Sequence, residues 1–286
     1  MKGILMKKVI LLSLALFSVY AYPQTDTAKV PPYGWKHGMV AALTLSQIAF
    51  TNWTAGGDNA LAWTITADGK SIDEQEKTTW TNNYKFAFGQ ARLGDGNLRK
   101  TDDKIDLESI LSYKMTQYVN PYAAVTFKSQ FAKGFKYPNN VETPVSKFFD
   151  PAYITESVGA GIQATKEIKT RLGFALRETF ADQFAAIYTD DPSTPGIEKS
   201  KVEGGLESVT DVDWKITDNI LFTSKLELFA PFKTIDHVDI RSDNKLTMSV
   251  NKYITANVAV QLLNVAPFPK TQVKETIAIG FTYNVF

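Results

Sequence analysis

The sequence predicts an all-β protein, a transmembrane antiparallel β-barrel of about 12 strands. Apolar and polar residues alternate with period two along many segments, links between these segments alternate between long and short, and the N-terminus resembles an export signal. The clearest alternation is in segment 273–285, where Ile277, Ile279, Phe281 and Tyr283 share one face and small or polar residues occupy the other. A final strand of this kind is typical of barrels in which the last strand closes the ring against the first.

The N-terminus predicts export. Lysines precede an apolar run at 9–19, which has the length of a signal-peptide core and is too short to span a membrane as a helix. We therefore expect a cleaved signal peptide at 1–21, with cleavage as late as residue 24 as an alternative. A periplasmic lead at 22–36 then precedes a barrel at 37–286.

Composition excludes several classes of function. The formal net charge is +1 without a dense basic stripe, so the sequence does not predict a nucleic-acid partner. Cysteine is absent, which excludes disulfides, thiol nucleophiles, thiolate metal sites and a lipoprotein anchor. We expect no cofactor and no bound metal. Hydrophobic residues make up 44% of the chain, too few for a helical membrane bundle but enough for a barrel, in which only alternate strand residues meet lipid.

The alternating segments predict the strands in order. The third is rich in outward aromatic residues, as an interfacial girdle requires, and from the fourth onward charged residues recur on one face only. The predicted strands are 38–48, 60–67, 79–88, 104–115, 125–131, 154–163, 169–180, 202–214, 220–228, 238–250, 254–262 and 273–285.

The links between predicted strands support a membrane barrel over a soluble sandwich. With the amino terminus in the periplasm, the extracellular links fall near 49–59, 90–103, 132–152, 182–200, 231–237 and 264–272. The periplasmic links fall near 69–76, 117–121, 166–168, 216–219 and 251–253. Most of the second set are tight turns and the first set are long, which is the asymmetry of outer-membrane barrels.

Four stretches resemble a known family. They are FTNWTAGGDN at 50–59, RKTDDKIDL at 99–107, FKSQFAKGFKYPN at 127–139 and FFDPAY at 148–153. With these stretches the chain resembles outer-membrane barrel proteins of unknown function that are widespread in the Bacteroidota. The resemblance implies the barrel and its membrane, and it brings no known substrate or catalytic residue.

These stretches are expected at or beside the extracellular rim. Gly56 and Gly57 permit a tight turn with positive backbone angles, and Trp53 can fold over the mouth or anchor in the headgroups. Either a packed loop that stabilises the rim or a ligand-binding rim fits the pattern. The candidate rim residues are Trp53, Gly56, Gly57, Asp102, Asp103 and Tyr137.

Inward charges of both signs predict cross-strand ion pairs in a narrow interior. Either these pairs plug the barrel, or Arg171 and Arg177 face Glu203 and Glu207 across a channel and select solutes by charge. The candidate constriction residues are Arg171, Arg177, Glu203, Glu207, Lys225, Glu227, Asp239 and Arg241.

The sequence does not predict an enzyme. The two histidines, His37 and His237, lie in no recognisable nucleophile motif. Serine hydrolysis would require one of them within hydrogen-bond reach of a serine that faces lipid. The acidic pairs at 102–103 and 190–191 lack the ligand spacing of a calcium loop.

The leading functional expectation is a channel or uptake pore in the cell outer membrane for small polar solutes. The alternative is a closed barrel with a structural or extracellular ligand-binding role, followed by a lipid-modifying enzyme. Expected partners are outer-membrane lipid, the barrel-assembly machinery during biogenesis and small polar solutes.

Overall fold

The structure is a computed structural model that describes residues 33–49, 58–191, 193–266, 268 and 270–285. The chain divides into two compact units, residues 1–32 and residues 33–286, and every described residue belongs to the second. The predicted signal peptide and the lead up to residue 32 lie outside the described residues. The end of the predicted lead, from Gly34, already belongs to the first strand.

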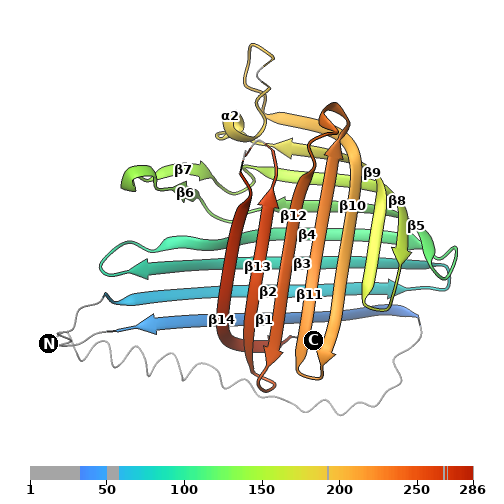
Figure 1. The fold of residues 1–286 in the computed structure, drawn as a ribbon, viewed down its shortest axis with the longest axis horizontal. Helices are drawn as coiled ribbons and strands as arrows, with labels where there is room; N and C mark the ends of the chain where they lie inside the picture. The colour runs from blue at the N-terminus through green and yellow to red at the C-terminus, as the bar shows by residue number, and fades with distance from the viewer. Residues whose placement is uncertain (1–32, 50–57, 192, 267, 269, 286) are drawn as a thin grey trace. The chain divides into compact units, whose positions relative to one another are not determined.

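Twelve strands of the second unit form one closed antiparallel barrel (Figure 1). Going round the ring, the order is β1, β14, β13, β12, β11, β10, β9, β8, β5, β4, β3 and β2. Their bounds are β1 Gly34–Ile48, β2 Ala60–Glu74, β3 Thr78–Leu93, β4 Arg99–Tyr113, β5 Val119–Ser129, β8 Ala152–Gln163, β9 Ile168–Phe180, β10 Ser200–Thr217, β11 Ile220–Pro231, β12 Asp239–Ser249, β13 Ile254–Asn264 and β14 Gln272–Asn284.

The ring is closed by pairing between the first and last strands. β1 and β14 pair antiparallel in a register that sets Leu43 opposite Phe281. Closure leaves no edge strand in the main sheet, so every strand has a partner on both sides for its backbone N–H and C=O groups. The predicted fold class and strand number are confirmed.

The links differ at the two ends of the barrel. At the short-turn end they are 75–77, 114–118, 164–167, 218–219 and 250–253, while the long-loop end carries 49–59, 94–98, 130–151, 181–199, 232–238 and 265–271. The links predicted at 90–103 and 69–76 are shorter in the structure, because β3 pairs with β4 as far as Ala91 opposite Arg99 and β2 pairs with β3 as far as Glu74 opposite Thr79.

The long-loop end has some structure of its own. The link after β5 contains a two-stranded sheet, β6 Gly134–Lys136 with β7 Thr143–Ser146, and the short helix η1 Pro138–Asn140. Helix α2 Ala185–Tyr188 lies in the link after β9, and η2 Phe232–Thr234 in the link after β11. These elements were not predicted, because each is too short to show a periodic pattern.

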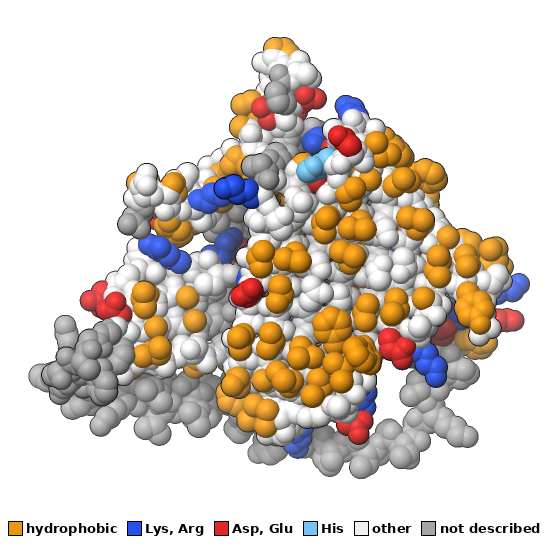
Figure 2. All heavy atoms as spheres, viewed as in Figure 1, with side chains coloured by type: hydrophobic (Ala, Val, Ile, Leu, Met, Phe, Trp, Pro, Cys, Tyr) orange, Lys and Arg blue, Asp and Glu red, His pale blue; other side chains and the backbone are white. Residues whose placement is uncertain are grey.

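Apolar side chains cover the outer wall. On β14, Ile277, Ile279 and Phe281 are among the exposed hydrophobic residues, and Figure 2 shows such side chains gathered over the face that β10 to β14 present. These are the odd positions of the predicted closing strand, so the alternation places its apolar face outward. No helix of the described residues is long and apolar enough to cross a membrane.

Two glycines let β8 and β9 approach closely. Gly159 and Gly173 lie directly opposite each other in the ladder. A Cβ atom on Gly173 would lie 2.3 Å from the carbonyl oxygen of Val158 and 2.7 Å from the hydroxyl oxygen of Tyr122. Residues larger than glycine therefore do not fit at this position without moving backbone.

Candidate functional site

The barrel interior is crossed by ion pairs between strands that are distant in the ring. Glu108 on β4 is their centre: its carboxylate accepts a bond of 2.6 Å from Arg171 Nη2 on β9 and bonds of 2.9 Å from Lys225 Nζ on β11. Glu108 is only 5% exposed. One buried carboxylate thus holds two cations from other walls of the barrel.

The same pattern continues beside Glu108. Lys128 Nζ on β5 donates to both carboxylate oxygens of Glu227 on β11, at 2.6 and 2.5 Å. Lys104 Nζ on β4 donates to Asp243 Oδ2 on β12 at 2.7 Å. β4 and β12 lie six strands apart in either direction round the ring, so this last bond spans the full width of the lumen.

These contacts join into one chain of alternating charge. Asp106 Oδ2 lies 3.7 Å from Lys128 Nζ and 3.8 Å from Lys104 Nζ, and Lys225 Nζ lies 3.9 Å from Glu227 Oε1. We call these eight side chains the lumen network. In order of contact, its members are Arg171, Glu108, Lys225, Glu227, Lys128, Asp106, Lys104 and Asp243.

The lumen network is formally neutral, with four basic and four acidic members. Charges as buried as those of Glu108 and Arg171, whose side chains are 3% and 9% exposed, are stable only when they are paired and hydrogen-bonded. Arg171 is only partly satisfied: within the described part of the chain, its Nε and Nη1 atoms have no acceptor. Both atoms can therefore donate to an anion or to water in the lumen.

A second cluster lies closer to the long-loop end. Arg177 Nη1 donates to Asp239 Oδ2 at 2.5 Å, and its guanidinium carbon lies 3.8 Å from the ring centre of Phe229. The guanidinium of Arg241 lies 5.2 Å from the ring centre of Tyr153. The cavity between this cluster and the lumen network measures about 30 Å³, so it has room for about one water molecule.

The structure brings together most of the predicted constriction residues, but with other partners. Arg171 binds Glu108 and Arg177 binds Asp239, whereas the sequence suggested that the two arginines face Glu203 and Glu207 across a channel. Glu203 instead contacts Lys201 Nζ at 2.7 Å on its own strand. Neighbouring strands were expected to supply the partners, whereas long side chains reach across this lumen to more distant strands.

The central role of Glu108 was missed at the sequence level. Its strand carries Lys104, Asp106 and Glu108 in the same phase, one basic and two acidic residues on one inward face. The inward face of β12 carries a longer run, Asp239, Arg241, Asp243 and Lys245, so the charge pattern alone does not single out Glu108. Sequence alone does not show that β4 faces β11 and β12 across the ring.

The predicted rim residues are divided between the described and undescribed parts of the chain. Trp53, Gly56 and Gly57 lie outside the described residues. Asp102 and Asp103 are within β4 rather than in a loop. Lys274 Nζ lies 2.8 Å from Asp102 Oδ2 across the lumen, and Asp103 accepts bonds from the backbone N–H groups that follow β5.

Tyr137 does lie at the long-loop end, between β6 and η1, where the guanidinium of Arg99 stacks 4.0 Å from its ring centre.

Both histidines are among the described residues. His237 Nε2 lies 3.7 Å from Asp239 Oδ1, and His37 Nδ1 lies 2.8 Å from Ser71 Oγ. Across the described ranges, no group of three or more His, Asp or Glu residues can hold a metal ion.

Solved structures of similar fold cover most of the chain. The translocator domain of the autotransporter NalP from Neisseria meningitidis has a TM-score of 0.38 at 10% identity, covering 99% of this chain and 95% of that one. An outer-membrane channel from Pseudomonas putida F1 has a TM-score of 0.39 at 10% identity, covering 92% and 99%. The NanC porin has a TM-score of 0.38 at 11% identity, covering 86% and 98%.

At these identities and TM-scores, nothing about the functions of those proteins passes to this chain. No curated protein sequence matches it. A family model described as a protein of unknown function (DUF3078) matches residues 45–135, which is less than half of the chain.

Proposed function

We propose that the chain is an outer-membrane β-barrel whose charged lumen is a narrow pore for small ions and polar solutes. The observation that supports this most directly is the lumen network, which joins opposite walls by hydrogen bonds of 2.5 to 2.9 Å. In this conformation the pairs close the pore. Solutes pass when the pairs separate, and the freed charges then select among solutes.

A purely structural role explains the lumen network poorly. Replacing buried ion pairs by apolar residues of similar volume is often neutral or stabilising, because charges lose much hydration energy when they leave water. A barrel selected for stability alone would be expected to fill with apolar side chains. Two Arg171 nitrogens have no acceptor among the described residues. Unsatisfied buried donors cost stability, which also argues against a purely structural role.

The proposed constriction adds Glu108 to the residues expected from the sequence. Arg171 and Lys225 are its cationic wall and Glu108 and Glu227 its anionic wall. Arg177, Asp239 and Arg241 lie at the entrance from the long-loop end, while Glu203 and Glu207 line β10 beside them.

A second candidate function is a closed barrel that acts through its extracellular rim. The specific observation in its favour is the cavity of about 30 Å³ beside the lumen network, too small for any solute beyond water. If the ion pairs never separate, ligand contact is left to the long-loop end, for example to Arg99 and Tyr137.

The cellular setting is part of the proposal. The apolar outer wall, the closed ring and the expected signal peptide at 1–21 support export to the outer membrane, with its lipid and the barrel-assembly machinery as partners. We place the long-loop end outside the cell and the short-turn end in the periplasm. The resemblance to barrel proteins of the Bacteroidota supports an origin in that group.

Conductance in planar bilayers tests the pore. The mature protein is compared with Arg171→Ala combined with Lys225→Ala, which leaves the two acids Glu108 and Glu227 in excess. We expect discrete steps in both, with selectivity shifted toward cations in the variant. Lys199→Ala is the control, because Lys199 is 72% exposed in a loop and far from the network. If none of the three proteins conducts, although heat-modifiable gel mobility shows that each is folded, the pore is discarded and the closed barrel is favoured.

A further inference from the structure

The outer wall carries a serine and a histidine in direct contact. His37 on β1 and Ser71 on β2 are directly opposite in the ladder, and His37 Nδ1 lies 2.8 Å from Ser71 Oγ. When the imidazole proton is on Nε2, the serine hydroxyl donates this bond. A serine whose hydroxyl is bonded to an imidazole is the basic unit of nucleophilic catalysis.

Both side chains point away from the lumen. They share the odd-numbered face of their strands with Leu43, Leu45 and Ile65, all of which are exposed on the outer wall. Ser71 itself is 9% exposed. A substrate therefore reaches it from the membrane side, after rotation of neighbouring side chains.

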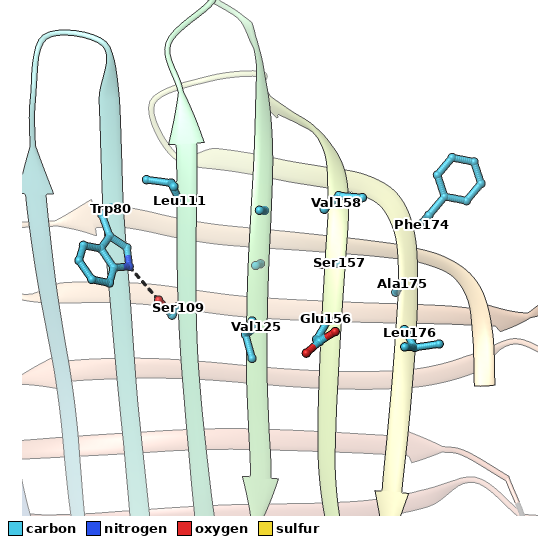
Figure 3. Close-up of a pocket in the computed structure, with 12 residues that line it drawn as sticks. Trp80, Ser109, Leu111, Val125, Glu156, Ser157, Val158, Phe174, Ala175 and Leu176 are labelled. Atoms are coloured by element: carbon cyan, nitrogen blue, oxygen red, sulfur yellow. Dashed lines mark hydrogen bonds between the residues drawn. The ribbon is translucent and has the colours of Figure 1, made fainter. Parts of the chain in front are cut away.

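Neighbouring tryptophan side chains indicate how deep this pair lies in the membrane. The Trp35 ring is stacked on the His37 ring, with centroids 5.6 Å apart and planes 2° apart, and its centroid lies 5.5 Å from that of Trp80. Trp80 Nε1 donates to Ser109 Oγ at 2.8 Å (Figure 3). Tryptophans on an outer wall near the strand ends settle at the lipid interface, which is the level of lipid ester bonds.

A third polar side chain completes the row. Asn82 on β3 lies directly opposite Ser71 and on the same face as Trp80. Side chains in directly opposed positions have Cβ atoms about 5 Å apart. An amide at this distance can donate to an oxyanion that forms on a carbon bonded to Ser71 Oγ.

The wall beside this row is hollowed. A shallow groove of about 700 Å³ runs from Trp80 over outward residues of β4, β5, β8 and β9, including Leu111, Val125 and Val158 (Figure 3). Its lining includes small side chains such as Ala123 and Ser109 and one carboxylate, that of Glu156. A groove of this kind accommodates an acyl chain next to the His37 and Ser71 pair.

We propose that the outer wall is a lipid esterase site that acts on acyl ester bonds at the short-turn interface. Ser71 is the nucleophile, His37 the general base and Asn82 the donor to the oxyanion. This activity goes beyond the proposed pore, because the lumen network plays no part in it.

The reaction has two balanced halves. Ser71 Oγ bonds to the ester carbonyl carbon as its proton passes to His37 Nδ1, and the lipid alkoxide leaves with that proton as a lysolipid. Water then adds to the acyl-serine and gives a proton to His37. The ester bond to Oγ breaks, the proton returns to Oγ, and a free fatty acid leaves.

The experiment uses the full mature barrel in vesicles of phosphatidylethanolamine and phosphatidylglycerol, with fatty acid and lysolipid measured by mass spectrometry. Ser71→Ala is expected to lower release by on the order of 10³-fold, and His37→Asn by a similar factor. Ser224→Ala is the matched control, because Ser224 is an outward serine on β11, in phase with Leu226, and lies outside the groove, so this variant should keep the activity.

A fluorophosphonate probe supplies a second readout, since it labels only an activated serine. Labelling of the wild-type barrel at Ser71, lost in His37→Asn, supports the site. Absence of both release and labelling from a folded wild-type barrel overturns it, and so does release that persists in Ser71→Ala. Conductance plays no part in either readout, so failure here leaves the proposed pore intact.

Discussion

Neutralising Glu108 is the sharpest test of how the lumen network is held. In Glu108→Gln the amide keeps the volume of the side chain but leaves Arg171 and Lys225, whose side chains are 9% and 12% exposed, without their shared carboxylate. Breaking a buried ion pair by removing one partner costs about 3–5 kcal/mol. Asp211 Oδ1 lies 3.8 Å from Lys225 Nζ and retains part of the compensation, so we expect the lower end, about 3 kcal/mol.

The free energy of unfolding is measured by urea titration of the barrel in lipid vesicles. The control is Asp182→Asn, which removes a 2.5 Å ion pair with Lys199 whose side chains are 65% and 72% exposed. Surface pairs of this kind contribute under about 1 kcal/mol. Adding Lys225→Met to Glu108→Gln removes one of the stranded cations and should recover part of the loss. If the free energy of unfolding of Glu108→Gln is within about 0.5 kcal/mol of the wild-type value, charge pairing does not stabilise this lumen.

Three further changes test other parts of the structure. Gly173→Ala places a Cβ atom 2.3 Å from the Val158 carbonyl oxygen and should lower the free energy of unfolding by about 1–3 kcal/mol. The control is Gly196→Ala, whose Cβ atom would have nothing within 4 Å and which should change the free energy of unfolding by less than about 0.5 kcal/mol. Equal effects of the two variants would contradict the crowding at Gly173. Burial raises the pKa of Tyr188 in the α2 link to about 12, so its contribution to stability is complete below its unfolded pKa of about 10 and is lost as the pH rises through 12. Phenol absorbance should show that step and lose it in Tyr188→Phe, and a step near 10 instead would refute the packing of this tyrosine. Asp150→Ala removes the carboxylate that accepts two hydrogen bonds, of 3.1 and 2.8 Å, from backbone N–H groups in the link after β9. Limited proteolysis should therefore cut that link faster in the variant. An unchanged cleavage rate would show that Asp150 does not hold the link in place.

Period-two alternation was enough to predict the barrel. A strand with one lipid face and one lumen face must alternate, so residues such as Ile277 and Phe281 report the outward face without any knowledge of their neighbours. Strand ends were predicted less well. β3 and β4 run past the expected ends because paired polar residues, such as Gln90 and Lys100, continue a ladder beyond the apolar pattern.

The site could be predicted only as a set of inward charges. Pairing depends on which strands face each other across the ring and on how far the side chains reach. Lys104 and Asp243 lie 139 residues apart in the chain and on opposite walls, yet they meet at 2.7 Å. No local sequence pattern predicts a contact between residues so far apart in the chain. Arg177 and Glu203, expected from the sequence to face each other across a channel, lie directly opposite on neighbouring strands, and their side chains contact Asp239 and Lys201 instead.

Alternation also allows one barrel to hold two unrelated sites. On β4, Glu108 points into the lumen and binds Arg171 and Lys225, while the next residue, Ser109, points outward and accepts a bond from Trp80. A change on one face leaves the other face in place, provided that the strand keeps its register. Glu108→Gln should therefore alter conductance without altering ester release, and Ser71→Ala should do the reverse. A variant on one face that changed both readouts would show that the wall between them moves.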